Sequence, residues 1–163
     1  PFYLDIGFTK TEIAVVTKAW GFAMSIAGAI LGGLLVARFG LLRALFACGL
    51  MQALANLAFA WLAGQGPSIP ALTVTIALEN LTSAMATAAF VAYLSGLCDR
   101  AYSATQYALL SAFAALGRKI FVAGGGEAAQ ALGWQTYFVG TTLAALPALL
   151  VLLWLMNKDR HFR

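Results

Sequence analysis

Residues 73–90 read TVTIALENLTSAMATAAF, an apolar run with a carboxylate and an amide, Glu79 and Asn80, side by side in its middle. The run lies within a longer apolar stretch, Ile69 to Leu97, which exceeds the ~20 residues that a helix needs to cross the hydrocarbon core of a bilayer. We expect a helix here, because an open sheet edge cannot face lipid. A charge near the membrane centre costs about 2.5–3.5 kcal/mol on insertion scales, so an intramembrane carboxylate indicates a functional site.

The composition of the whole chain agrees with a membrane environment. Of 163 residues 62% are hydrophobic and 10% are charged, and the mean hydropathy is +0.86. Soluble domains have roughly 25% charged residues, and a soluble core of this size could not bury so much apolar surface. Cys48 and Cys98 have neither a disulfide framework nor a metal-ligand spacing, so we interpret both as packing residues. The chain is therefore predicted to be an all-α integral membrane protein without a metal site.

Five apolar segments are long enough to cross a bilayer. They are residues Glu12 to Ala37, Leu41 to Ala63, Ile69 to Leu97, Ser103 to Ala123 and Trp134 to Met156. Short connectors separate them, and residues 1–8, PFYLDIGF, resemble the end of another membrane helix. Because the chain starts at Pro1 without an initiator methionine, we expect it to be a piece of a longer protein.

Lysine and arginine residues predict the orientation. If five helices alternate across the membrane, six cations fall on one side, whereas Lys10 is alone on the other. The six are Arg38, Arg43, Arg100, Lys158, Arg160 and Arg163. The positive-inside rule places these six residues, and with them the C-terminus, in the cytoplasm.

Away from the span ends, ionisable residues lie in three of the five spans. They are Lys18 in the first span, Glu79 in the third, and Arg118 and Lys119 in the fourth. We therefore expect these three helices to face a polar interior and the other two to face mostly lipid. The Lys119 side chain is instead expected to extend to the membrane surface. Lys18 could also do so, as an alternative to facing the polar interior.

Polar and small residues accompany these charges at helical spacing. The three stripes are Lys18, Ser25 and Gly32; Asn80, Ser83 and Thr87; and Tyr107, Ser111 and Arg118. Small neighbours leave room for a ligand or water, whereas the Gly28–Gly32 pair is the GxxxG pattern of close helix packing. The sequence therefore predicts a substrate and proton pathway lined by Glu79, Asn80, Lys18, Arg118, Ser83, Tyr107 and Ser111.

Catalysis and nucleic-acid binding are not indicated. The only histidine, His161, lies in the C-terminal tail, and no nucleophile has an oriented base nearby. The GGGEAAQ run, residues 124–130, lacks the Lys-Ser/Thr of a phosphate loop, so we interpret it as a flexible turn. The net charge of +4 is not concentrated in a basic patch. We expect no enzyme activity, no cofactor and no nucleic-acid partner.

The connector GGLLVARFGLLRAL, residues 32–45, resembles the cytoplasmic loop signature of the major facilitator superfamily. Gly33, Arg38, Gly40 and Arg43 match that signature, as does Gly32, whereas Ala37 stands where an acidic residue is usual. Residues 2–21, 77–98 and 103–118 together resemble the C-terminal half of AmpG-type muropeptide permeases, in the branch that also contains acetyl-CoA transporters.

This resemblance implies the C-terminal six-helix half of a twelve-helix transporter: five membrane helices plus the end of a sixth, with the N-terminal half absent. It implies proton-coupled import of 1,6-anhydro-muropeptides across the bacterial inner membrane for cell-wall recycling, with the proton as coupling ion. Glu79 would then exchange a proton near Lys18 or Arg118, and the two cations would suit a substrate that bears carboxylates. The alternatives are a related permease for acetyl-CoA or a siderophore, or a non-transporting membrane subunit or sensor.

Overall fold

A computed structural model of the chain describes residues 2–98, 103–123 and 125–161, which form helices joined by short turns. In chain order these are α1 (Phe2–Ile6), α2 (Lys10–Val16), the π-helical segment η1 (Thr17–Gly21), α3 (Phe22–Phe39), α4 (Leu41–Gln65), α5 (Ile69–Leu97), α6 (Ser103–Ala123), α7 (Gly125–Leu132), α8 (Trp134–Ala144) and α9 (Leu146–His161). Within these residues the secondary structure is entirely helical, as predicted.

Four helical stretches of the described residues are long and apolar enough to cross a membrane. They are Lys10–Phe39, Leu41–Gln65, Ile69–Leu97 and Trp134–Lys158. The first stretch joins α2, η1 and α3, and the last joins α8 and α9. Helix α6 occupies the remaining predicted span with the predicted bounds, but Gln106, Arg118 and Lys119 make it less apolar than the other four.

Local sequence accounts for the ends of these helices. Thr9 caps α2: its hydroxyl accepts a hydrogen bond from the Glu12 amide at 3.3 Å, and the Glu12 carboxylate accepts one from the Thr9 amide at 2.8 Å. The turn between α3 and α4 is Gly40 alone, whose φ of +84° is accessible to glycine without strain. Pro70 lies in the first turn of α5, where a missing amide proton costs no helical hydrogen bond.

One segment differs from the sequence-based expectation, and another shows the kink that Pro147 is expected to cause in the last span. Residues 124–130 were expected to be a flexible turn, yet α7 begins at Gly125, because the alanines, Gln130 and Leu132 that follow the glycines are strong helix formers. The last predicted span is interrupted at Ala145, two residues before Pro147, where the chain makes a turn between α8 and α9. This interruption is the expected effect of proline, which removes a helical hydrogen bond and disfavours helix before it.

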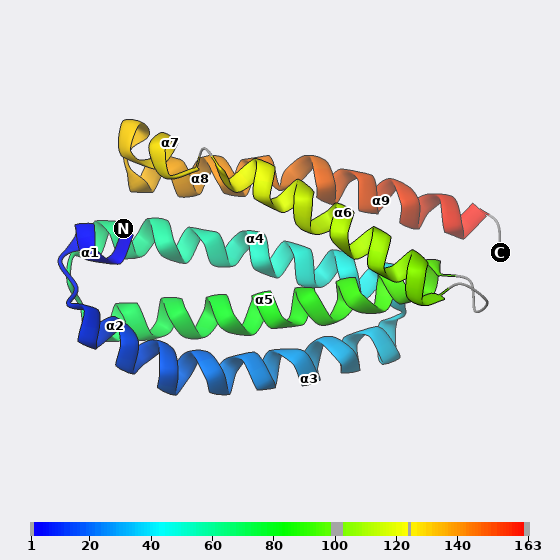
Figure 1. Cartoon of the computed structure of the whole chain (residues 1–163), viewed down its shortest axis with the longest axis horizontal. Helices are drawn as coiled ribbons and strands as arrows, with labels where there is room; N and C mark the ends of the chain where they lie inside the picture. The colour runs from blue at the N-terminus through cyan, green and yellow to red at the C-terminus, as the bar shows by residue number, and fades with distance from the viewer. Residues whose placement is uncertain (1, 99–102, 124, 162–163) are drawn as a thin grey trace.

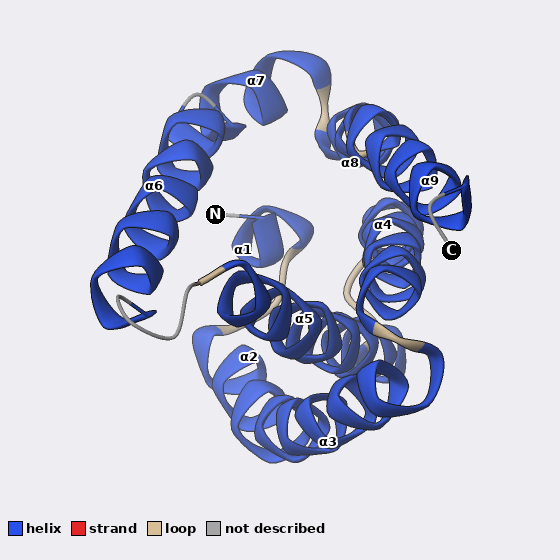
Figure 2. Cartoon of the chain, turned by 90° about the vertical axis from the view of Figure 1, so that its right-hand side faces the viewer, coloured by secondary structure: helices blue, strands red, loops and turns tan. Residues whose placement is uncertain are grey.

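Helix α5 lies at the centre of the packing. It contacts α3 and α4 along much of its length, and α4 in turn contacts α8 and α9. Figure 2, an end-on view, shows α5 flanked by α3 and α4, with α6 standing on the other side of the molecule. Near the N-terminus, Phe2 of α1 packs edge-on against Phe59 of α4 and against Trp134 and Phe138 of α8. The first few residues are thus anchored to the rest of the bundle.

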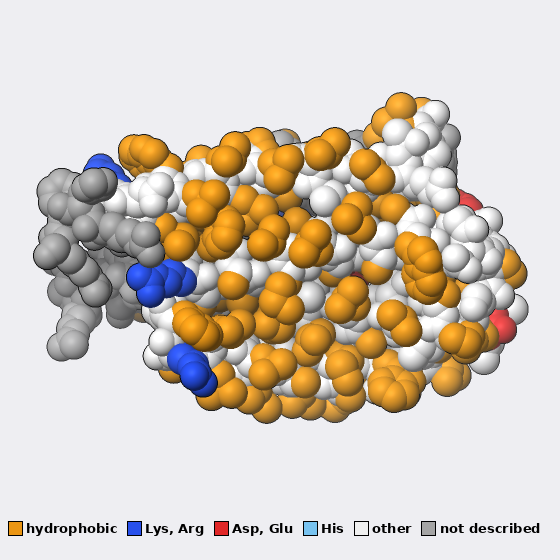
Figure 3. All heavy atoms as spheres, turned by 180° about the vertical axis from the view of Figure 1, so that it is seen from behind, with side chains coloured by type: hydrophobic (Ala, Val, Ile, Leu, Met, Phe, Trp, Pro, Cys, Tyr) orange, Lys and Arg blue, Asp and Glu red, His pale blue; other side chains and the backbone are white. Residues whose placement is uncertain are grey.

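The surface has the distribution that a bilayer requires. Apolar side chains cover the long face seen in Figure 3, lysine and arginine gather at one end of it, and acidic side chains lie at the other. Figure 1 shows the α3–α4 turn, which is flanked by Arg38 and Arg43, at the same end of the molecule as the C-terminal end of α9, where Lys158 lies. Arg100 and Arg163, which belong to the predicted cytoplasmic set, lie outside the described residues.

Candidate functional site

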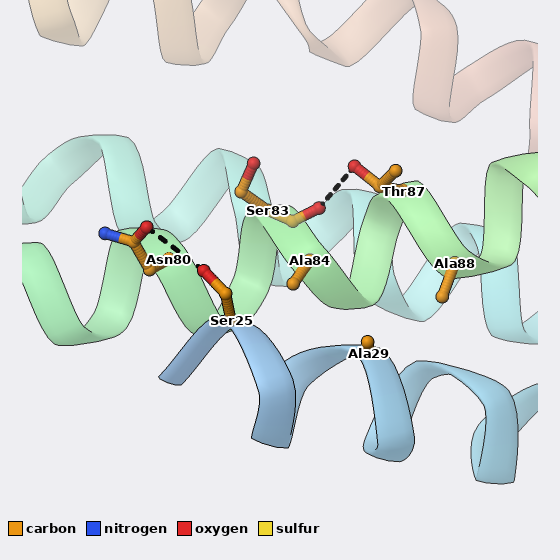
Figure 4. Close-up of a pocket in the computed structure, with 7 residues that line it drawn as sticks. All are labelled: Ser25, Ala29, Asn80, Ser83, Ala84, Thr87 and Ala88. Carbon is orange, nitrogen blue, oxygen red and sulfur yellow. Dashed lines mark hydrogen bonds between the residues drawn. The ribbon is translucent and has the colours of Figure 1, made fainter. Parts of the chain in front are cut away.

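A groove with a volume of about 310 Å³ runs between α3 and α5, and we call it the α3–α5 groove (Figure 4). Its lining residues, all small or polar, are Ser25 and Ala29 of α3 and Asn80, Ser83, Ala84, Thr87 and Ala88 of α5. A groove that offers a few polar groups between small side chains in an apolar bundle is a place where a ligand can be held at membrane depth.

Glycine residues of α3 bring the two helices close together beside this groove. A Cβ added at Gly28 would meet the Leu81 carbonyl oxygen and would lie 2.9 Å from Cβ of Ala84. A Cβ added at Gly32 would lie 2.6 Å from the Met85 carbonyl oxygen. The GxxxG pattern therefore serves close helix packing, as interpreted from the sequence.

Asn80 links the two walls of the groove. Its Oδ1 accepts a hydrogen bond from the Ser25 hydroxyl at 3.3 Å, and its Nδ2 donates to the Ile76 carbonyl at 2.8 Å (Figure 4). Its side chain also packs on Gly21, where an added Cβ would lie 3.3 Å from Nδ2. Gly21 ends the π-helical segment η1, and such segments are frequent at functional sites. Asn80 and Ser83 thus lie in the groove, and Ser25 of the first stripe joins them.

Glu79 contacts a different helix. Its two carboxylate oxygens, Oε1 and Oε2, accept hydrogen bonds from Nε2 of Gln52 on α4, at 3.2 Å and 3.1 Å. The carboxylate is partly buried, and it does not line the α3–α5 groove. Successive residues of a helix are rotated by about 100°, since 3.6 residues make one turn. This rotation directs Glu79 to α4 and Asn80 to α3, on different faces of α5.

Gln52 is a site residue that the sequence analysis did not select. Gln52 lies in α4, and the central part of that span has no charged residue, so α4 was expected to face mostly lipid. The signal that would have found it is an amide in an otherwise apolar run, Leu50 to Leu54. In the described structure, the Oε1 atom of Gln52 is a buried side-chain oxygen without a hydrogen-bond partner.

The other predicted pathway residues lie apart from Glu79. Lys18 is exposed on η1, and Arg118 is exposed on α6. Neither forms an ion pair with Glu79, whose side-chain hydrogen bonds in the described structure are those with Gln52. Tyr107 and Ser111 are half-buried on α6, where the Ser111 hydroxyl donates to the Tyr107 carbonyl at 2.6 Å. The structure therefore does not bring the α6 stripe to the groove.

The predicted loop motif lies where α3 meets α4. Arg38 is in the last turn of α3, Gly40 makes the turn, and Arg43 is in the first turn of α4. Gly33 has nothing within 4 Å of the position that a Cβ would occupy. Among the residues that the structure describes, no group of three or more His, Cys, Asp or Glu side chains is arranged to hold a metal ion.

Comparison with known proteins identifies relatives over nearly the whole chain. The chain is 40% identical over 158 residues to "Putative transporter AmpG 4" of Rickettsia conorii, an overlap that covers 97% of this chain and 38% of the relative. It is 38% identical over 148 residues to "Anhydromuropeptide permease" of Escherichia coli K12, covering 91% of this chain and 30% of the relative. It is 35% identical over 162 residues to "Putative transporter AmpG 3" of Rickettsia prowazekii, an overlap that covers 99% of this chain and 38% of the relative.

These overlaps mean that the chain spans 30% to 38% of the length of these relatives. The permease and transporter names of the relatives agree with the absence of a catalytic constellation from the sequence, and they favour a transporter over an enzyme. Residues 1–163 also match the sequence profile of the Major Facilitator Superfamily. With its helical bundle, its four strongly apolar helical stretches and this match over the whole length, the chain belongs to the Major Facilitator Superfamily.

Proposed function

We propose that this chain is the C-terminal half of a proton-coupled transporter that imports 1,6-anhydro-muropeptides across a bacterial inner membrane for cell-wall recycling. The observation that carries the proposal is the α3–α5 groove, which places the side chains of Ser25, Asn80, Ser83 and Thr87 among small alanines. It lies in a helical bundle whose sequence is 38% identical over 148 residues to that of a relative named anhydromuropeptide permease. Ser25, Asn80 and Ser83 offer hydroxyl and amide groups to the sugar and peptide of such a substrate.

The transporter is completed by an N-terminal half. Transporters of this superfamily carry substrate at the interface of two halves, by rocking one half against the other. The described chain accordingly presents one wall of the substrate cavity. Arg118 and Lys18 are exposed in this half and are therefore free to meet carboxylates of the substrate's peptide in the complete protein.

The experiment that tests this function is uptake of radiolabelled anhydro-muropeptide into right-side-out vesicles that contain the full-length transporter, with and without a protonophore. We expect concentrative uptake that the protonophore abolishes. Inverted vesicles and vesicles without the transporter serve as controls. If the inserted protein takes up no muropeptide above the empty vesicles, the substrate assignment is wrong, and acetyl-CoA and siderophores are the next substrates to assay.

Glu79 is the residue we assign to proton coupling, since it is the acidic residue in the apolar part of the described spans. Glu79→Gln keeps the size of the side chain but cannot exchange a proton. We expect this variant to insert normally and to lose concentrative, protonophore-sensitive uptake, while it still equilibrates substrate down its gradient. Concentrative uptake by Glu79→Gln would contradict the proton role of this residue.

A further inference from the structure

In the contact between Glu79 and Gln52, the amide nitrogen of Gln52 forms hydrogen bonds but the amide oxygen does not. A glutamine side chain offers a donor group, the Nε2 amide, and an acceptor, Oε1. Nε2 of Gln52 donates toward both carboxylate oxygens of Glu79, at 3.2 Å and 3.1 Å, whereas Oε1 is buried and has no partner. Leaving a buried acceptor unsatisfied is destabilising, so an unpaired oxygen beside a carboxylate needs an explanation.

We propose that Gln52 is the positioning residue for proton binding at Glu79, and that the pair forms a proton site between α4 and α5, separate from the α3–α5 groove. The proposal rests on the proposed function, in which Glu79 carries the coupling proton. A proton from the aqueous phase adds to one carboxylate oxygen, and no other covalent bond changes. The new O–H donates to Gln52 Oε1, and Gln52 Nε2 donates to the remaining carbonyl oxygen of Glu79.

Protonation therefore completes the hydrogen bonding of the pair. The neutral acid and the amide form a closed ring of two hydrogen bonds, in which the donor and the acceptor of Gln52 are both used. The ionised form leaves Oε1 unpaired, as in the described structure. The proton therefore changes which atoms of Gln52 join α4 to α5: Nε2 alone bonds to the ionised carboxylate, whereas Nε2 and Oε1 both bond to the neutral acid. Partly buried polar pairs of this kind respond strongly to the loss of one member.

The surrounding charges leave Gln52 as the direct partner. Lys18 of η1 and Arg118 of α6 are exposed and form no ion pair with Glu79. The charges of α2 and the described arginines of α3 and α4 lie at the ends of those helices. Tyr3 of α1 is a titratable group within electrostatic range of the Glu79 carboxylate. Because it forms no hydrogen bond with Glu79, Tyr3 cannot replace the amide.

The position of the pair gives it a role in coupling. α5 carries Asn80 toward the α3–α5 groove and Glu79 toward α4. A change in the α4–α5 contact therefore acts on the same helix that forms one wall of the groove. Substrate and proton then act on opposite sides of one element, which is a physical basis for linking their movements.

The test is infrared difference spectroscopy of the full-length transporter between high and low pH. We expect the carbonyl band of a protonated carboxylic acid to appear as the pH falls, and to be missing in Glu79→Gln. In Gln52→Leu the band should move to higher frequency, because the acid loses both the donor to its carbonyl and the acceptor of its O–H. Gln52→Asn, whose shorter amide no longer reaches, should show the same shift and serves if the leucine variant does not fold.

Asn56→Leu is the matched control. Asn56 is an amide one turn further along α4, it is half-buried like Gln52, and it is not a hydrogen-bond partner of Glu79. Its variant should keep the band at the wild-type frequency. A band that does not move in Gln52→Leu or Gln52→Asn overturns the proposal, as does the absence of any protonated Glu79 band at low pH in the folded wild-type protein.

Transport measurements separate this proposal from the proposed function. Gln52→Leu should lower protonophore-sensitive accumulation by about tenfold, since a hydrogen bond to a charged group contributes about that factor. Substrate counterflow, which needs no net proton movement, should be retained. If Glu79→Gln abolishes accumulation but the band is insensitive to Gln52, the pairing is wrong and the function stands. If the band depends on Gln52 but Glu79→Gln still accumulates substrate, the coupling role is wrong and the pairing stands.

Discussion

At the scale of single residues, the site is organised by the different directions of two neighbouring side chains. Glu79 bonds to Gln52 of α4, and Asn80 bonds to Ser25 of α3. The sequence places both in the apolar run, and it marks Glu79 as the unusual residue, because an intramembrane carboxylate is costly. It does not reveal that Gln52 is the partner, because an uncharged glutamine in a membrane span costs less free energy than a carboxylate and is therefore less conspicuous.

Water access is the residue-scale property that separates a transport groove from a closed bundle. Ser83 lines the α3–α5 groove, whereas its neighbour Thr82 is only 1% exposed. In a background without Cys48 and Cys98, we expect Ser83→Cys to react with a water-soluble thiol reagent and Thr82→Cys to remain unlabelled. Equal labelling of the two cysteines would argue against an aqueous groove, and an unreactive Ser83→Cys would favour a non-transporting subunit or sensor.

At the scale of elements, the contact between α3 and α5 depends on missing side chains. Gly28 and Gly32 leave no room for a Cβ, because carbonyl oxygens of α5 occupy the space. The sequence shows this pair as a GxxxG pattern, and the structure adds which helix it meets. By contrast, the sequence analysis did not predict the π-helical segment at Thr17–Gly21, whose last residue, Gly21, lies against Asn80 of α5.

A pair of glycine variants measures the α3–α5 contact. We expect Gly28→Ala to lower the free energy of unfolding by about 1–3 kcal/mol, the usual cost of forcing extra volume into a packed interface. The matched variant Gly33→Ala adds its Cβ to open space. It should be neutral or stabilising by up to about 1 kcal/mol, since alanine favours a helix over glycine. Thermal unfolding of the purified full-length transporter in detergent gives both values. A Gly28→Ala variant as stable as Gly33→Ala would show that this contact is looser than described.

At the scale of the whole molecule, the charges and the apolar surface define how the chain sits in a bilayer. The turn flanked by Arg38 and Arg43 lies at the same end of the bundle as the C-terminal end of α9, and apolar side chains cover the face between the two ends. Helix α6 contacts mainly α5 and α7, and its Arg118 is exposed.

The orientation is a prediction that a topology assay can check. Because cationic residues favour the cytoplasmic side, a green fluorescent protein fused after Arg163 should fluoresce, whereas alkaline phosphatase fused at the same place should be inactive. The reverse result is expected for fusions in the α4–α5 turn at Gly66. An active phosphatase at the C-terminus would refute the predicted orientation.

The sequence by itself determined the class of the protein and the position of most of its helices along the chain. Bilayer thickness and the cost of buried charge act on local composition, so the apolar runs predicted the bounds of α5 and α6 and the main part of the other spans. The same local reasoning missed α7, because the glycines before it were given more weight than the helix-forming residues that follow.

Only the tertiary structure decided which side chains meet. In helices that are apolar nearly all round, no stripe of hydrophobic residues indicates which face turns toward which neighbour. Glu79 was expected near a cation, yet it lies against the Gln52 amide, while Asn80 lies in the groove with Ser25 and Ser83. The physical reason is that these pairings depend on how α3 and α4 dock on α5, and this docking is set by close contacts at small residues such as Gly28 rather than by the polar residues themselves.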